Sequence, residues 1–392
     1  MLMNYLPKIK LFSCLLTLIF VLSSCASLQS LKFWSDNNDE VDVGEPKQLN
    51  DFIERKTIST NWKISFEGDN YLGNFEPSFS GDSMFFADKD GNISSINNQT
   101  GEENWTIKTN NLSAGISSGF GVLAVSDIDG NVIILEQSNG NEIWSSNIKA
   151  EVLSKVAIDA KFIIVKTSSG ELIALDKNTG DLKWSYRSKL PNLTIRGSSS
   201  PIIIENLIYA TFDNGRLVVF DISSGFPVWD GAISYVEGSS EIENLIDSDA
   251  SPVVIENYAY AINYQGYLNV FDIRQKRTVW RSKISSFYEP VLVKKQIIIL
   301  DSNSELKSFS QNSFSDSWNS DEYLHRELSN HQSIKGDIVV GDKEGYIHII
   351  DSLSGETIGR KKISRKPIKT IYSRSNNFYV VDEAFNLFSL TI

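Results

Sequence analysis

Residues 162–186 read FIIVKTSSGELIALDKNTGDLKWSY, and this stretch decides the fold. It contains two apolar runs, each followed by a turn rich in Ser, Gly, Asp or Asn, and it then reaches Trp184. Short apolar runs bounded by turn residues are typical of antiparallel strands. In the second turn, Asp176 can hydrogen-bond its own backbone and Gly180 can adopt a left-handed conformation. The stretch therefore predicts consecutive strands joined by tight turns.

The same signature recurs along the whole chain. Seven of the eight tryptophans are separated by 43, 39, 40, 45, 51 and 38 residues, and Gly359 stands 41 residues after the last of them, where another tryptophan would fall. The pattern Asp, four residues to Gly, four residues to Trp returns at Asp221, Gly225 and Trp229 and weakens toward the C-terminus. The periodic tryptophans are Trp62, Trp105, Trp144, Trp184, Trp229, Trp280 and Trp318.

This period predicts a β-propeller. One sheet of about 40 residues cannot bury both of its faces, whereas sheets arranged radially pack on one another. A tryptophan buries roughly 150–250 Å², so one ring per repeat is expected to fill the space between neighbouring blades. The chain stops at Ile392 before a further tryptophan, and Trp62 has no strand pair before it. We therefore expect an all-β, eight-bladed propeller of four-stranded antiparallel blades, with the N-terminal strand completing the last blade.

The first 24 residues resemble a bacterial lipoprotein signal peptide. Lys8 and Lys10 precede an apolar run, residues 11–22, which is too short to span a bilayer. Leu22-Ser-Ser-Cys25 resembles a lipobox, which implies a diacylglycerol on the Cys25 sulfur and an N-acyl chain on its amine. An ordinary secretory signal with an incidental cysteine is the alternative. No aspartate follows Cys25, so we expect a lipid anchor in the outer membrane, with the protein facing the periplasm.

The mature chain divides into two parts. Residues 25–50 are expected to form the lipidated N-terminus and a flexible tether, which is polar and acidic from Ser35 onward. Residues 51–392 are expected to form the propeller. Cleavage of the signal removes two lysines and no acid, so the formal net charge goes from −12 to −14. An acidic chain repels phosphate backbones, which makes nucleic acid an improbable partner.

The sequence offers little catalytic chemistry. The three histidines, His325, His331 and His348, have no metal-ligand spacing around them. The segments 88–91 and 127–130 look like calcium loops, but both lack a glutamate at the twelfth position and fall at the hairpin point of the repeat. We therefore interpret them as turns, and we expect no catalytic residue, no metal and no cofactor besides the lipid.

A rival interpretation comes from the repeats themselves, which also resemble the blades of quinoprotein alcohol dehydrogenases. Those enzymes hold pyrroloquinoline quinone and calcium on the propeller axis. This chain has no pair of adjacent cysteines and is too short for the large insertions that build the quinone pocket. A dehydrogenase-like propeller dependent on pyrroloquinoline quinone stays as the alternative function.

Two long steps between tryptophans place insertions at 190–197 and 238–249, and with these loops the whole chain resembles the BamB family of outer-membrane protein assembly factors. In that family, an apolar and arginine-bearing loop contacts a periplasmic domain of the barrel-inserting subunit BamA, with acidic residues beside it. The matching residues are Leu193, Ile195, Arg196, Asp247 and Asp249, with isoleucine at 195 in place of the family's leucine. Alternatively, Arg196 only bridges Asp247 or Asp249 within the propeller.

The resemblance implies a non-enzymatic scaffold that binds BamA, is monomeric within the β-barrel assembly complex, and assists the insertion of β-barrel proteins into the outer membrane. Exposed strand edges could also capture unfolded outer-membrane proteins by β-augmentation.

Overall fold

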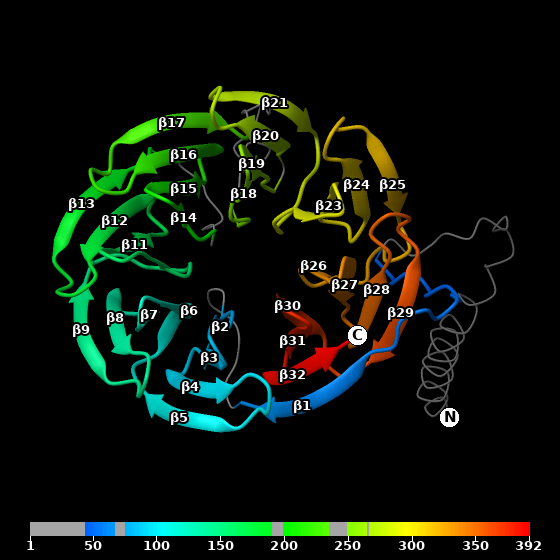
Figure 1. The fold of residues 1–392 in the computed structure, drawn as a ribbon, viewed down its shortest axis with the longest axis horizontal. Helices are drawn as coiled ribbons and strands as arrows, with labels where there is room; N and C mark the ends of the chain where they lie inside the picture. Colours follow the sequence, from blue (N-terminus) through cyan, green and yellow to red (C-terminus); the bar gives the residue numbers. More distant parts are fainter. Residues whose placement is uncertain (1–43, 67–74, 190–198, 235–248, 265) are drawn as a thin grey trace, which may run out of the picture. The chain divides into compact units, whose positions relative to one another are not determined.

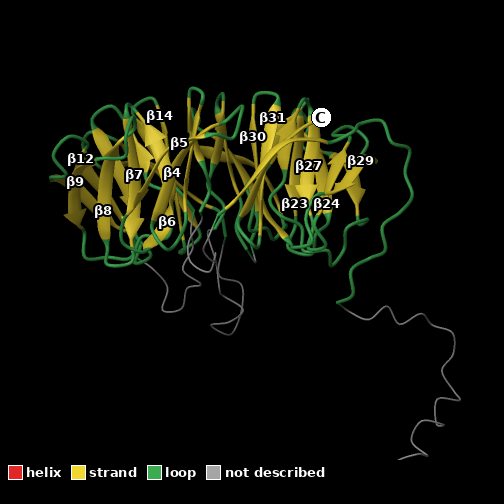
Figure 2. Ribbon diagram, turned by 90° about the horizontal axis from the view of Figure 1, so that it is seen from below, coloured by secondary structure: helices red, strands yellow, loops and turns green. Residues whose placement is uncertain are grey.

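The computed structural model describes residues 44–66, 75–189, 199–234, 249–264 and 266–392. Within the unit from Pro46 to Ile392, eight four-stranded sheets surround a central axis (Figure 1), and they stand side by side when the ring is viewed edge-on (Figure 2). The strands of each sheet pair antiparallel. The predicted eight-bladed propeller is confirmed. Nothing helical in the described ranges has the length and apolar character needed to cross a membrane.

We number the blades in chain order. Blades 1 to 4 comprise β2 (Ser78–Ser80), β3 (Ser83–Ala87), β4 (Asn92–Asn97) and β5 (Glu103–Lys108); β6 (Leu112–Gly119), β7 (Val122–Asp127), β8 (Asn131–Glu136) and β9 (Glu142–Asn147); β10 (Ala157–Ile158), β11 (Phe162–Lys166), β12 (Glu171–Asp176) and β13 (Leu182–Arg187); and β14 (Ile202–Ile204), β15 (Leu207–Phe212), β16 (Arg216–Asp221) and β17 (Pro227–Ala232).

Blades 5 to 8 comprise β18 (Val253–Ile255), β19 (Tyr258–Ala261), β20 (Leu268–Asp272) and β21 (Arg277–Ser282); β22 (Val291–Val293), β23 (Gln296–Leu300), β24 (Leu306–Ser310) and β25 (Asp316–Ser320); β26 (Gln332–Ile334), β27 (Asp337–Gly341), β28 (Tyr346–Ile350) and β29 (Thr357–Lys362); and β30 (Ile368–Arg374), β31 (Asn377–Asp382), β32 (Asn386–Thr391) and β1 (Ser59–Ser65).

The turn between the second and third strands of a blade is built on a buried polar residue. Asp88 Oδ1 accepts a hydrogen bond from the Asn92 backbone N–H at 2.9 Å, and Asp127 Oδ1 accepts one from Asn131 at 2.8 Å. These bonds satisfy donors inside the turn that would otherwise be buried without a partner. The two segments that look like calcium loops are thus hairpin turns, as predicted. Equivalent bonds are made by Thr167, Asp301, Asp342 and Asp382.

Each periodic tryptophan packs against an outer turn of the next blade. A Cβ added to Gly180 would lie 2.7 Å from Trp144 Cε3, and one added to Gly225 would lie 2.4 Å from Trp184 Cδ2. Both glycines have positive φ, 76° and 70°, so glycine is required for its conformation and for the room that it leaves. The indole N–H of Trp184 also donates to the Ile222 carbonyl at 2.9 Å. The predicted role of tryptophan between neighbouring blades is confirmed.

Where the glycine is missing, the turn keeps its conformation. Lys276 and Phe314 occupy the glycine position with φ of 53° and 56°, a region that side chains rarely adopt. Phe314 stacks on Trp280 with 5.2 Å between ring centroids and 10° between planes, and the Lys276 carbonyl accepts the Trp229 indole N–H at 3.1 Å. The contact between blades therefore survives the decay of the sequence motif.

The N-terminal strand closes the ring. β1 pairs antiparallel with β32, so that Ser59 faces Thr391 and Lys63 faces Phe388. This pairing gives blade 8 its fourth strand (Figure 1), as the sequence predicts.

The segment before β1, residues 46–58, runs along blade 7, and we call it the N-terminal arm. The backbone N–H of Lys47 donates to the Leu324 carbonyl at 3.0 Å, and that of Lys56 donates to Ile358 at 2.9 Å. The arm therefore includes the last residues of the segment that the sequence assigns to the tether. A Cβ added to Gly359 would lie 2.4 Å from the Lys56 carbonyl oxygen. The arm thus takes the place that a tryptophan occupies in the other blades, which explains the glycine.

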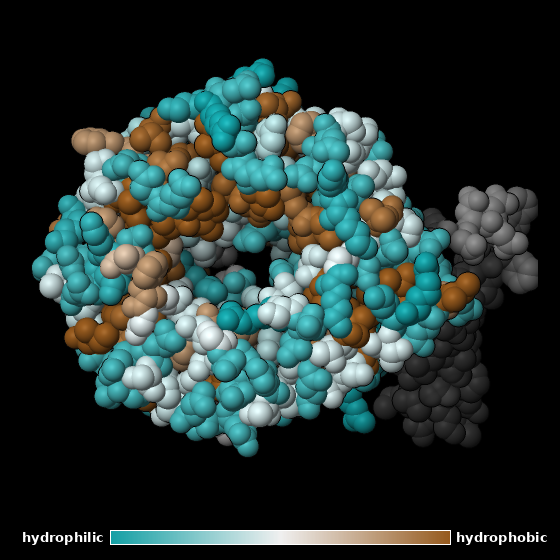
Figure 3. Space-filling view, in the orientation of Figure 1, coloured by the Kyte–Doolittle hydropathy of each residue, from teal (hydrophilic) through white to brown (hydrophobic). Residues whose placement is uncertain are grey.

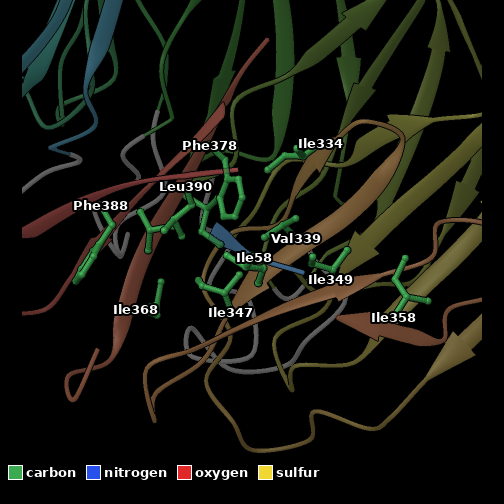
Figure 4. Close-up of a cluster of buried hydrophobic side chains, with 12 residues drawn as sticks. Ile58, Ile334, Val339, Ile347, Ile349, Ile358, Ile368, Phe378, Phe388 and Leu390 are labelled. Atoms are coloured by element: carbon green, nitrogen blue, oxygen red, sulfur yellow. The ribbon is translucent and has the colours of Figure 1, made fainter. Parts of the chain in front are cut away.

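The apolar core is divided among the interfaces between blades. Each of eight buried clusters joins residues of two neighbouring blades. In the cluster between blades 7 and 8, Ile58 of the arm lies among Ile349 and Ile358 of blade 7 and Phe378 and Leu390 of blade 8 (Figure 4). The arm therefore contributes to the core as well as to the strand pairing.

Candidate functional site

The sequence assigns partner binding to two inserted segments. The first connects β13 to β14 and the second connects β17 to β18. Leu193, Ile195, Arg196 and Asp247 lie outside the described residues, as does Cys25. Asp249 is half-buried at the end of the second segment. The structure does describe the residues at which each segment leaves one blade and enters the next.

The C-terminal ends of the two segments lie side by side. The backbone N–H of Ser200 donates to Ser251 Oγ at 2.9 Å across 51 residues of sequence. The Thr211 hydroxyl, on β15, lies 2.9 Å from Ser199 Oγ and 3.4 Å from the Ala250 carbonyl oxygen. One side chain thus bonds the ends of both segments, so that the two segments rejoin their blades next to each other.

The N-terminal ends are held as well. Asn214 Nδ2 donates to Ser188 Oγ at 2.9 Å and to the Lys189 carbonyl at 3.2 Å, just before the first segment. Ser234 Oγ donates to Asn263 Oδ1 at 2.8 Å, just before the second. All four ends are therefore fixed by side chains of blades 4 and 5.

A cavity of about 800 Å³ lies beside these ends. The space-filling view shows an opening at the centre of the ring (Figure 3). Six of the many residues that line the cavity are Glu76, Lys155, Ser200, Asp249, Ser251 and Glu289. They come from different repeats, so the cavity is a product of the ring and of no single blade.

The charges in this cavity are mixed. Lys155 Nζ lies 3.5 Å from Glu76 Oε2. The Glu289 side chain is in contact with the cavity. The many protein atoms around its carboxyl group reduce its hydration, and this desolvation, together with the nearby Glu76 carboxylate, raises the pKa of Glu289 to about 7. Burial also raises the pKa of Tyr372 well above its usual value. The cavity is therefore lined by carboxyl groups and by two lysines, Lys155 and Lys369.

His331 also lines the cavity and is buried. Its Nε2 lies 2.9 Å from the Ile298 carbonyl oxygen, so Nε2 carries the proton and donates. Burial lowers the pKa of His331 to about 4, which keeps the ring neutral at pH 7.

This histidine predicts a pH-dependent stability. The unfolded chain takes up a proton on His331 near pH 6.5, whereas the folded chain excludes that proton down to about pH 4. The free energy of unfolding should therefore fall as the pH drops through this window, by about 3 kcal/mol from His331 alone. Urea unfolding of the wild type and His331→Gln at pH 7, 5.5 and 4.5 measures it, and the variant should lose less stability. An equal loss in both proteins contradicts the assignment.

In the described ranges, no group of three or more His, Cys, Asp or Glu residues could hold a metal ion. His348 is buried between Asp342 and Arg360, with Nε2 3.0 Å from Asp342 Oδ2 and Nδ1 accepting from Arg360 Nε at 3.1 Å. Both ring nitrogens of His348 are therefore hydrogen-bonded within blade 7.

Comparison with known proteins gives the family. The family model described as "Outer membrane protein assembly factor BamB" matches residues 89–320. The chain belongs to the BamB family. It is 30% identical over 369 residues to the protein of that name from Legionella pneumophila, covering 93% of this chain and 96% of the relative. It is 28% identical over 360 residues to that of Yersinia pestis, covering 88% and 91%. These relatives are named as assembly factors, not as enzymes.

Solved structures support the fold. The crystal structure of BamB from Moraxella catarrhalis superposes with a TM-score of 0.79 at 24% identity, covering 86% of this chain and all of that one. The quinohemoprotein alcohol dehydrogenase from Comamonas testosteroni superposes at 0.67 with 11% identity, covering 85% of this chain and 76% of that one. Likeness at these identities shows the shared fold alone.

Of the charged residues around the cavity, the sequence indicated Asp249 but not the others. Glu76, Lys155 and Glu289 belong to no motif, and they come together only because the ring brings blades 1, 3 and 6 toward one axis. No spacing rule within one repeat could have found them.

Proposed function

We propose that this chain is a lipid-anchored, non-enzymatic scaffold of the outer-membrane β-barrel assembly complex, acting without a cofactor. It faces the periplasm from an acylated Cys25. It binds a periplasmic domain of BamA through Leu193, Ile195 and Arg196 with Asp247 and Asp249 beside them, and it thereby assists the insertion of β-barrel proteins.

Family membership and one structural observation support the proposal. The ends of the two segments that carry these residues are bonded to each other, through Ser200 and Ser251 and through Thr211. Residues from both segments can therefore act on one partner. An apolar anchor with an arginine that pairs with two oxygens at once is a common centre of binding energy at protein interfaces.

The test is a binding measurement with the purified periplasmic region of BamA and the lipid-free mature domain. We expect the wild type to bind and Arg196→Ala to lose about 2 kcal/mol or more of binding free energy, roughly thirtyfold in affinity. The matched control is Arg187→Ala in blade 3, whose side chain is 70% exposed and pairs with Glu171. That variant should bind like the wild type.

Three outcomes separate the explanations. Loss confined to a folded Arg196→Ala supports direct contact. If charge reversal at Asp247 and Asp249 weakens binding while Arg196→Ala does not, the acidic residues carry the contact. Absence of wild-type binding rejects the scaffold role and returns attention to the axial cavity as a ligand site.

A further inference from the structure

The repeats provide an internal comparison at one buried position. The residue directly before the hairpin-turn residue is buried in every blade. Seven of these eight residues are uncharged, and the eighth is Lys166 in blade 3, whose side chain is only 4% exposed. The eight residues are Ala87, Ser126, Lys166, Phe212, Ile262, Leu300, Gly341 and Val381.

A buried ammonium group is costly unless hydrogen bonds compensate for its lost water. Lys166 Nζ donates to the Ser199 carbonyl at 3.2 Å and to Ser199 Oγ. Both Ser199 and Thr211, which bonds it, are 1% exposed. The lysine therefore reaches out of blade 3 to the residue at which the first inserted segment rejoins blade 4.

Buried serines near the start of two other blades are bonded differently. Ser286 Oγ donates to the Leu300 carbonyl at 2.7 Å, and Ser113 Oγ donates to the Asp127 carbonyl at 3.1 Å. Those bonds stay within one blade and hold its own sheet. Ser199 is also held by Lys166 across the boundary between blades 3 and 4. The other seven blades have no charged residue at the position of Lys166.

The bonds continue to the second segment. Thr211 Oγ1 lies between Ser199 Oγ and the Ala250 carbonyl oxygen, and the Ser200 N–H donates to Ser251. A chain of hydrogen bonds thus runs from blade 3 through the end of the first segment to the end of the second. Lys166 is the residue of blade 3 that joins it.

We propose that Lys166 is a positioning residue for the partner-binding surface. It fixes Ser199 and, through Thr211, the Ala250 end of the second segment, and so holds together the described points at which both segments rejoin their blades. It makes no contact with the partner itself. The expected loss of affinity for the partner rests on the proposed function. The expected effect on the free protein rests on the hydrogen bonds alone.

The test uses Lys166→Met, which restores an apolar residue at a position that other blades fill with apolar residues. We expect a folded protein with a circular dichroism spectrum like that of the wild type. Its affinity for the periplasmic region of BamA should fall about tenfold, because the surface must be ordered on binding. Amide exchange at Ser200, whose N–H donates to Ser251 Oγ, should become faster in the free protein, because the neighbouring residue Ser199 is no longer held by Lys166.

The matched variants are Ser199→Ala and Ser286→Ala. The first removes the Oγ atom that joins Lys166 to Thr211 and leaves only the bond from Lys166 to the backbone carbonyl of residue 199. It should shift affinity and exchange in the same direction, and it stands in if Lys166→Met does not fold. The second removes a buried serine that precedes β22 in blade 6, and it should change neither affinity nor exchange at Ser200. A role in stability alone would lower the unfolding midpoint and leave the affinity of the folded protein unchanged.

The outcomes are distinguishable from those of the proposed function. If the wild type does not bind BamA, the proposed function fails, and exchange at Ser200 still decides whether Lys166 holds the segment end. If the wild type binds and folded Lys166→Met matches it in affinity and in exchange, the positioning role is wrong.

Discussion

Replacing Arg326 by methionine should lower the free energy of unfolding by about 3–5 kcal/mol, because it leaves a buried carboxylate without its cation. Arg326 is 3% exposed and Asp342 is fully buried. The guanidinium donates to Asp342 Oδ2 through Nε at 2.9 Å and through Nη2 at 2.7 Å. Its Nη1 also donates to the Lys47 carbonyl at 3.0 Å. One side chain therefore neutralises Asp342 and holds the N-terminal arm.

The same carboxylate organises blade 7. Burial would raise the pKa of Asp342, but hydrogen bonds from His348, the Tyr346 backbone N–H and Arg326 hold it below the usual value. Asp342 also closes the hairpin turn between β27 and β28. Losing Arg326 therefore disturbs a turn, a buried histidine and the arm together.

Equilibrium unfolding in urea measures the effect of Arg326→Met against the wild type. The control is Arg187→Met, which removes an exposed pair with Glu171 and should cost no more than about 1 kcal/mol. A loss below 1 kcal/mol for Arg326→Met would show that the buried network contributes little to stability.

Replacing Gly359 by tryptophan should destabilise the protein although it completes the sequence repeat. The arm occupies the space, since a Cβ at 359 would lie 2.4 Å from the Lys56 carbonyl oxygen. An indole there has to displace the arm, with its bond to Ile358 and the buried side chain of Ile58. Overpacking typically costs 1–3 kcal/mol, and we expect a total loss of about 3 kcal/mol or more when the arm is displaced.

Two measurements check this expectation. Urea unfolding should show the loss, and limited proteolysis should cut Gly359→Trp within the arm, residues 46–58, faster than the wild type. Gly119→Ala is the control, because the atom nearest to an added Cβ there is Ile158 Cβ at 3.5 Å, an ordinary contact distance. Unchanged stability and unchanged cleavage in Gly359→Trp would mean that the arm does not depend on the missing side chain.

The two predictions concern the same region for a physical reason. The fourth strand of blade 8 is β1, so the third and fourth strands of this blade are not joined by an outer turn like the one that receives a tryptophan in the other blades. The arm fills this gap, and Arg326 and Arg360 bond its carbonyl groups at Lys47 and Asn50. Closure of the ring therefore relies on polar contacts to the arm as well as on strand pairing.

What the sequence determined by itself was the propeller, its blade number and its closure by the N-terminal strand. These follow from features that repeat every 40 residues or so, such as Asp176, Gly180 and Trp184, whose effects are local turns and one contact with the adjacent blade. Repetition makes such signals readable because each copy supports the others.

Only the tertiary structure decided the features that occur once. Gly359 looked like a lost tryptophan until the arm was seen against it. Lys166 belongs to no motif of the repeat, and only the structure places its ammonium group at Ser199. The axial cavity and the Arg326–Asp342 pair likewise join residues from separate elements. Such contacts depend on how distant segments meet in space, and no periodicity or local motif encodes that meeting.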